Sequence, residues 1–284
     1  MIREEVVPAV RFLLSLIDPD DAATVRARLR IDPPSESSES SESRLDGRVA
    51  RELRLLWPPR AVLLWMLEQD DPVMNEFVFH HMEPSDTIKR DIVRGVPFGA
   101  APGPLQVTWT CERPRCSHEE PEIPVSPLGL IGGLRQARSM STARAATRAV
   151  SKADWPEVAE ADRVEPLPGF TRWALSSRID CPPELRVQFG SHPKFAHRQR
   201  RDGIVEPREY AARSTPARFV LGVLHLGTRL FPERANEAAE LLAPLVRRDL
   251  GANPEAWAAL AQVLPTFSGP APELVRTCGA STDV

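Results

Sequence analysis

The fold of this chain is decided by one stretch, which reads WALSSRIDCPPELRVQFGSHP from Trp173 to Pro193. A short apolar helix is expected to begin at Trp173 and to stop at the polar turn Asp180-Cys181. The double proline after this turn fixes φ near helical values and predicts a second short helix from about Glu184. Two helices of this size cannot enclose a core alone. The stretch therefore predicts a unit that packs on similar neighbours.

A recurrent helix-turn-helix pattern is carried by part of this stretch, at Ala174-Leu175, Arg178, Asp180-Cys181-Pro182-Pro183-Glu184-Leu185-Arg186 and His192-Pro193. In these positions the chain resembles the leucine-rich-repeat-variant and HEAT-like helical repeats. The resemblance implies a curved stack of short α- and 3₁₀-helices and no fixed activity. A partial second copy, with one proline and no cysteine, lies at residues 63–77.

The remainder of the chain predicts an all-α protein, because its apolar residues recur at helical spacing and no long segment alternates strictly. We expect an irregular, α-solenoid-like helical repeat with a C-terminal helical bundle and a proline-rich middle segment. Three segments are predicted from the sequence: an N-terminal multi-helical module at 1–95, a proline-rich irregular segment with one arginine-rich helix at 96–168, and the repeat-like unit with the C-terminal bundle at 169–284. Within the second segment, residues 155–168 are expected to form a proline-containing link.

Local signals predict where individual helices begin. Asp18, Ser85 and Thr215 each precede a helical apolar pattern and are expected to act as N-caps, and Asn253 is expected to open a further helix. The large apolar residues expected in the core of the first module are Trp57, Trp65, Met66, Phe77 and Phe79. Residues 35–43 read SESSESSES, which predicts a solvated loop, with a cluster of regulatory phosphorylation sites as the alternative.

Composition restricts the partners and the compartment. The formal net charge of -3 and the pI near 6.1 give no general reason to expect nucleic acid or an anionic membrane as partner. Four cysteines, no signal-like N-terminus and no apolar run of about 18 residues predict a soluble cytoplasmic protein with reduced thiols. Lysine occurs only at Lys89, Lys152 and Lys194, and this arginine bias indicates a bacterial, GC-rich genome.

One grouping has the residue types of a metal site, Cys111-x₄-Cys116-x-His118. Two thiolates and an imidazole could occupy three corners of a zinc tetrahedron. The fourth ligand would have to be Glu119, Glu120 or a distant histidine. Because no fourth ligand is evident, the sequence predicts no cofactor and well under one zinc per chain. A zinc-stapled loop is the alternative.

Two further features could carry chemistry. His80 and His81 are adjacent, and adjacent side chains on a helix point about 100° apart, so they cannot share one face. We expect one of them on the helix surface and the other half-buried, without a catalytic or metal-binding role. Cys181, in the turn of the opening stretch, is expected to be a small buried thiol.

The predicted function is non-enzymatic: a protein–protein interaction or scaffold module that holds a protein partner in a groove of packed helices. The first alternative is a helical-repeat protein that binds nucleic acid through arginine clusters. Its candidate residues are Arg135, Arg138, Arg198, Arg200 and Arg201. The second alternative is an enzyme with an unrecognised site, since no nucleophile elbow, phosphate loop or zinc-protease motif is found.

Overall fold

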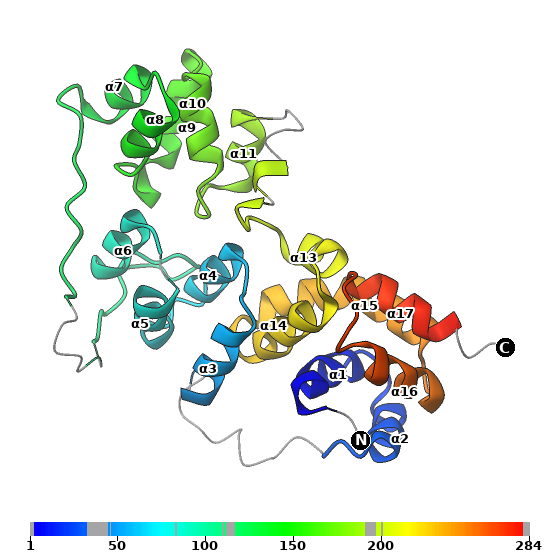
Figure 1. Cartoon of the computed structure of the whole chain (residues 1–284). Coiled ribbons are helices and arrows are strands. Elements are labelled where there is room, and N and C mark those ends of the chain that lie inside the picture. The colour runs from blue at the N-terminus through cyan, green and yellow to red at the C-terminus, as the bar shows by residue number, and fades with distance from the viewer. Residues whose placement is uncertain are drawn as a thin grey trace. The chain divides into compact units, whose positions relative to one another are not determined.

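The structure is a computed structural model that describes residues 3–32, 45, 47–82, 84–109, 111, 117–190, 197–199 and 201–280 (Figure 1). All regular elements in these ranges are α- or 3₁₀-helices, and the ranges contain no strand. The prediction of an all-α protein is confirmed at this level. The Ser/Glu run at 35–43 and the His192-Pro193 part of the repeat pattern lie outside the described residues.

The helices form two compact units, and each unit has its own core. The first unit joins Met1–Pro58 with Val205–Val284, and the second is Pro59–Ile204. These limits differ from the segment limits predicted after residues 95 and 168. The difference arises because the two ends of the chain pack on each other, which no local composition signal records.

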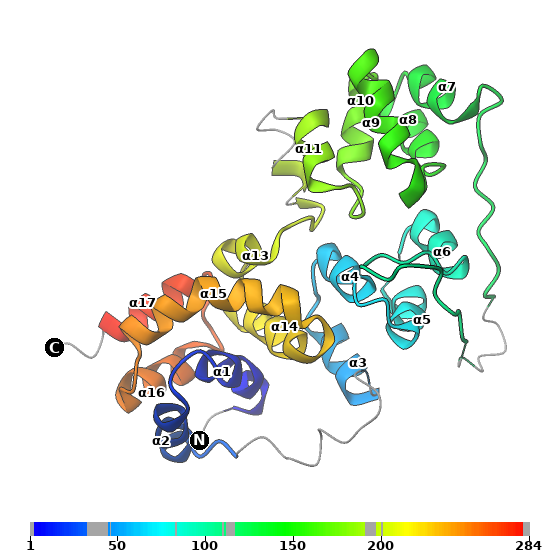
Figure 2. The same ribbon diagram turned by 180° about the vertical axis from the view of Figure 1, so that it is seen from behind.

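The helices of the first unit are η1 (Glu4–Val6), α1 (Val7–Leu14), α2 (Pro19–Leu29), α3 (Gly47–Leu55), α13 (Pro207–Arg213), α14 (Ala217–Leu230), α15 (Pro232–Asp249), α16 (Pro254–Val263) and α17 (Ala271–Ala280). Helix α14 packs along α1 and α15, and α15 also packs on α13 and α17 (Figure 2). The largest fully buried side chains of this unit include Phe12, Phe231 and Trp257. Gly222 permits close packing, because a Cβ there would lie 2.9 Å from the Leu56 side chain.

The helices of the second unit are α4 (Arg60–Leu67), α5 (Pro72–His81), α6 (Asp86–Val93), α7 (Gly129–Gln136), α8 (Met140–Thr147), η3 (Lys152–Asp154), α9 (Trp155–Val164), α10 (Gly169–Ser176) and α11 (Pro183–Phe189). Between α6 and α7, the described residues contain no helix or strand. This long irregular connection is where the prolines are dense, as their missing N–H groups and fixed φ require.

Asp18 and Ser85 act as the predicted N-caps, and Asn253 caps the helix that it was expected to open. The cap predicted at Thr215 is absent, because α14 begins at Ala217 with Pro216 at its N-cap position and no side-chain cap. The Asp18 carboxylate accepts the Asp20 N–H at 2.9 Å, Ser85 Oγ accepts the Ile88 N–H, and Asn253 Oδ1 accepts the N–H of Glu255. Each cap satisfies a backbone donor that the first helical turn leaves without a partner.

Two predictions about the middle of the chain are wrong. Residues 155–168 are not simply a link, because α9 occupies Trp155–Val164. Pro156 lies in the first turn of that helix, where no N–H is needed, so it starts the helix and does not break it. The arginine-rich helix is in fact two helices, because the Ser139 side chain caps α8 in a capping box with Thr142.

One expected core residue is on the surface. Trp57 is 85% exposed and has a φ of +49°, which carries the chain out of α3 toward the prolines that precede α4. The other four aromatic and sulfur-containing residues expected in the first module are buried, and they are Trp65, Met66, Phe77 and Phe79.

The opening stretch forms the expected helix pair, α10 and α11. Leu185 and Phe189 are buried, and with Cys181 they belong to one hydrophobic cluster that also contains Trp155 of α9. Val187, on the same helix, is 72% exposed. Leu185 and Phe189 therefore lie on the buried face of α11, and Val187 lies on its exposed face.

The turn between α10 and α11 is fixed by an arginine. The Arg178 guanidinium donates to the carbonyl oxygens of Thr147 and Val150 at 2.6 and 2.7 Å, and it pairs with Asp180 at 2.5 Å. It also lies 4.9 Å from the centre of the Trp155 ring. One side chain therefore joins the turn to the end of α8 and to α9.

Candidate metal centre

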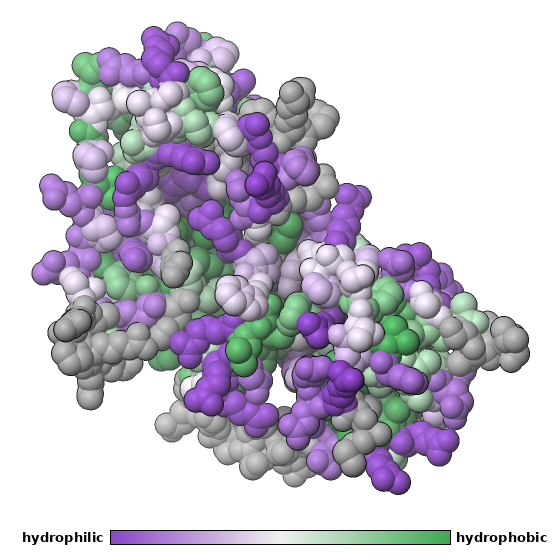
Figure 3. All heavy atoms as spheres, in the orientation of Figure 1, coloured by the Kyte–Doolittle hydropathy of each residue, from purple (hydrophilic) through white to green (hydrophobic). Residues whose placement is uncertain are grey.

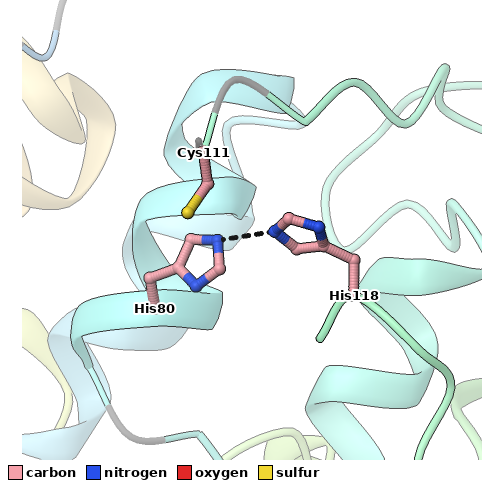
Figure 4. A group of neighbouring side chains, drawn as sticks. All are labelled: His80, Cys111 and His118. Carbon is pink, nitrogen blue, oxygen red and sulfur yellow. Dashed lines mark hydrogen bonds between the residues drawn. The ribbon is translucent and has the colours of Figure 1, made fainter. Parts of the chain in front are cut away.

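Three potential metal ligands meet in the second unit. His80 lies in the last turn of α5, whereas Cys111 and His118 belong to the irregular connection between α6 and α7. Their donor atoms all lie within 4.8 Å of one another. Figure 4 shows the two imidazole rings facing each other and the Cys111 sulfur directed toward the His80 ring.

The distance between the histidines fits a shared ion. Their Nε2 atoms are 3.1 Å apart. Nitrogen ligands about 2.0–2.1 Å from a tetrahedral zinc ion lie about 3.3–3.4 Å from each other, so a shift of a few tenths of an ångström would suffice. In the absence of an ion, the same two nitrogens form a hydrogen bond in which one ring supplies the proton.

The position of His80 is set by the start of α5. Asp71 caps this helix, because its Oδ1 accepts the N–H groups of Val73 and Met74 at 2.8 and 3.2 Å. Pro72 occupies the first turn, where a proline is favoured. The helix therefore begins at a defined residue, and His80 stands at a defined angle in its last turn.

A second aspartate ties the irregular connection to the turn before α5. The Asp70 carboxylate accepts three backbone N–H groups, from Phe98, Gly99 and Ala101, each at 2.8–2.9 Å. Asp70 itself has a φ of +51°. Three hydrogen bonds to one carboxylate fix the early part of the connection beside α4 and α5.

The connection then turns back toward α5. Gly95 has a φ of +66°, and its carbonyl oxygen accepts the N–H of Leu105 at 2.8 Å. A Cβ at this glycine would lie 2.4 Å from the Leu105 carbonyl oxygen, so no other residue fits. This close approach helps to return the chain toward α5 and the Cys111–His118 region.

Aromatic rings enclose the imidazoles. The Trp109 ring stacks on His118, with centroids 4.3 Å apart and an interplanar angle of 14°. Phe79 packs edge-on against both His80 and Trp109, at 5.2 and 5.0 Å. These contacts orient the rings and keep water from part of the site, which strengthens metal–ligand interactions.

A buried carboxylate lies beside His80. Glu76 precedes His80 by one helical turn, and its Oε1 is 4.0 Å from His80 Nε2. Both side chains are only 9% exposed. A carboxylate at this place could accept a hydrogen bond near the ion.

The other candidate ligands considered from the sequence are Cys116, Glu119 and Glu120. Cys116 lies outside the described residues, and so does the His81 side chain. Glu120 pairs with Arg94 at 2.6 Å, and the hydrogen bond from this arginine lowers the pKa of the Glu120 carboxyl. The distant histidine that the sequence required is His80, although we expected no metal-binding role there. Its signal was the Glu76/His80 spacing, since positions i and i+4 share one helix face.

The arginine clusters are partly engaged within the second unit. Arg135 donates to the Ala161 carbonyl oxygen at 3.0 Å and pairs with Glu165 at 2.5 Å. Arg198 lies 4.0 Å from the centre of the Trp173 ring. Arg138 and Arg201 are exposed, and Arg200 lies outside the described residues. Arg135 and Arg198 are therefore used at least partly for packing.

No family model, curated protein or solved structure matches this chain. Among the described residues, none of the helices has the length and apolar character needed to cross a membrane. The role of the chain is accordingly inferred from the geometry of its own residues.

Proposed function

We propose that this protein binds a transition-metal ion, zinc in the first place, through His80, Cys111 and His118. The observation that carries the proposal is the convergence of their donor atoms within 4.8 Å. One thiolate and two imidazoles suit zinc, whereas magnesium and calcium prefer oxygen ligands. This replaces the expectation of a zinc-free chain, which rested on the missing fourth ligand.

The ion would have a structural role, in which it links α5 to the irregular connection. His80 is held by α5, whereas Cys111 and His118 belong to a connection without helix or strand in its described residues. An ion bound to all three closes a long loop, and its binding free energy adds to the stability of the folded unit. Such a structural ion is compatible with the wider predicted role as an interaction or scaffold module. That role, and the solenoid-like arrangement, remain predictions.

The test is the zinc content of the untagged protein, purified without chelators from cells supplied with zinc. We expect about one zinc per chain in the native protein and strong depletion in His80→Ala, Cys111→Ser and His118→Ala. His197→Ala is the matched control, because this histidine is exposed and lies in the same unit. Stoichiometric zinc in His80→Ala would show that the ion lies elsewhere.

A second measurement separates loss of the ion from loss of the fold. The circular dichroism of each variant should remain helical, because helices α7–α11 have their own hydrophobic cluster. Thermal stability of the native protein should fall when a chelator is added, and stability of His80→Ala should not respond to it.

A further inference from the structure

A hollow of about 510 Å³ lies in the first unit, between the C-terminal end of α2 and helix α16. This volume is within the range of about 300–1,000 Å³ that is usual for small-molecule sites. The residues that line it are Arg3, Arg28, Leu29, Arg30, Ala258, Ala261, Gln262 and Pro265. Figure 3 shows hydrophilic and hydrophobic side chains mixed on the visible face of the first unit.

The charged residues that line the hollow in the described part of the chain are all positive. Three of its lining residues are arginines, and its lining in the described part of the chain includes no carboxylate. Arg28 pairs with Glu255 at 3.4 Å and Arg3 with Glu5 at 3.8 Å, and all four side chains are more than half exposed. Solvent screens pairs of this kind, so the two arginines can exchange them for a stronger anion.

Arg30, the third arginine of the lining, has an uncommon backbone conformation. It is the C-cap of α2, with φ +56° and ψ +43°, which is the left-handed conformation that glycine usually occupies. The turn is fixed by hydrogen bonds from the Arg30 N–H to Ala27 and from the Ile31 N–H to Arg26. Among the described residues the Arg30 guanidinium has no hydrogen bond or ion pair. The exposed Arg30 guanidinium can therefore donate hydrogen bonds to a ligand at the edge of the hollow.

The floor of the hollow is apolar. Leu29 is buried at the end of α2, and Ala258 and Ala261 lie three residues apart on one face of α16. These small side chains leave space between the two helices. The Gln262 amide adds a neutral donor at the side. The lining therefore matches a ligand with an anionic group and an apolar body.

We propose that this hollow binds a small organic phosphate of about nucleotide size. Guanidinium groups match phosphate oxygens in paired hydrogen bonds, which favours phosphate over a halide or a single carboxylate. The apolar body of the ligand would lie on Leu29, Ala258 and Ala261. This site is separate from the metal centre and does not depend on it.

The experiment is calorimetric titration of the full-length protein with adenosine monophosphate, pyrophosphate and citrate at low salt and at about 0.15 M salt. We expect adenosine monophosphate to bind more tightly than pyrophosphate, because only the nucleoside phosphate uses the apolar floor. Arg28→Gln combined with Arg30→Gln should weaken binding at least about tenfold. Arg208→Gln, an exposed arginine outside the hollow in the same unit, should leave it unchanged.

A further variant distinguishes binding from folding. Arg30→Gly should weaken binding and also raise the melting temperature, because glycine adopts the left-handed conformation without strain. Absence of binding by both phosphates at about 1 mM would overturn the proposal. The proposal would also be overturned if the Arg28→Gln/Arg30→Gln variant bound adenosine monophosphate as tightly as the native protein does. Stronger binding of citrate than of either phosphate would overturn it too.

Discussion

His80 and His118 are 38 positions apart in the sequence, yet their Nε2 atoms lie 3.1 Å from each other. A direct hydrogen bond needs a proton on one of these nitrogens, whereas a shared metal ion needs a lone pair on both. The Cys111 sulfur lies within 4.8 Å of a ring nitrogen of each histidine, so it is the nearest candidate for a third ligand among the described residues. The two imidazoles can therefore bind one ion through these atoms only when neither Nε2 carries a proton.

Removal of the ion should loosen this connection. In the native protein we expect amide hydrogen exchange at residues 105–109 and 117–120 to speed up when a chelator is added. His80→Ala should show the fast exchange before any chelator is present. Exchange in α14 and α15, which belong to the other unit, is the internal control. If the exchange rates in the connection did not change, they would contradict the proposal that a bound metal holds it in place.

The cysteines should differ in reactivity. Burial raises the pKa of the Cys181 thiol to about 12, and burial also raises the pKa of Cys278. Because the thiolate is the reactive form, both should resist alkylation by iodoacetamide near pH 8. Cys111 is half-buried, and it should be alkylated in chelator-treated protein and protected with zinc present. Peptide mass spectrometry measures this, and equal labelling of Cys111 in the two states would oppose its role as a ligand.

Phe189 should be a determinant of the stability of the second unit. Its side chain is 2% exposed and packs in the cluster that contains Trp155. Phe189→Ala should lower the free energy of unfolding by about 3–5 kcal/mol, as for other buried aromatic truncations. Val187→Ala, on the same helix but 72% exposed, should change it by less than about 0.5 kcal/mol. Similar effects of the two substitutions in denaturant titrations would show that α11 does not pack through Phe189.

Asp162 should make stability depend on acid pH. Its burial opposes ionisation, but hydrogen bonds from Arg172, Gln188 and the Leu167 N–H outweigh burial and hold the pKa of Asp162 below its ordinary value. Because the folded-state pKa is the lower one, the unfolded chain takes up the proton first as pH falls. The stabilisation is therefore complete above the unfolded-state pKa of about 4 and is lost below it.

Asp162→Asn tests this contribution. The variant should be less stable at pH 7 by about 1–3 kcal/mol, and its stability should fall less steeply between about pH 5 and pH 2. Glu160→Gln, an exposed carboxylate on the same helix, is the control and should keep the native slope. Parallel acid profiles for the native protein and Asp162→Asn would contradict the buried hydrogen-bonded carboxylate.

Local structure is predictable where a short motif determines it. Asp18 and Ser85 cap their helices as expected, because each cap depends only on the next two or three residues. The prediction of a link at residues 155–168 is wrong, since a proline marks either a break or a first turn, and the residues after it decide which. After Pro156, buried residues such as Val158 and Asp162 recur at helical spacing. This spacing indicates that a helix continues beyond the proline, so that the proline lies in its first turn.

The candidate site was only half predictable, because it depends on contacts between distant residues. The Cys111/His118 pair has a recognisable spacing, but the approach of His80 depends on the turn at Gly95 and on the three hydrogen bonds to Asp70. Neither feature has a signal in the sequence near the ligands. The packing of α1 on α14 escaped prediction for the same reason, since it joins the two ends of the chain.

X-ray absorption at the zinc edge of the natively purified protein tests the metal centre most directly. We predict about one zinc per chain, with a single sulfur neighbour at about 2.3 Å, nitrogen neighbours at about 2.0–2.1 Å and the scattering pattern of two imidazoles. Cys111→Ser should remove that sulfur contribution. Protein without zinc, or zinc with only oxygen and nitrogen neighbours, would contradict a site built from His80, Cys111 and His118.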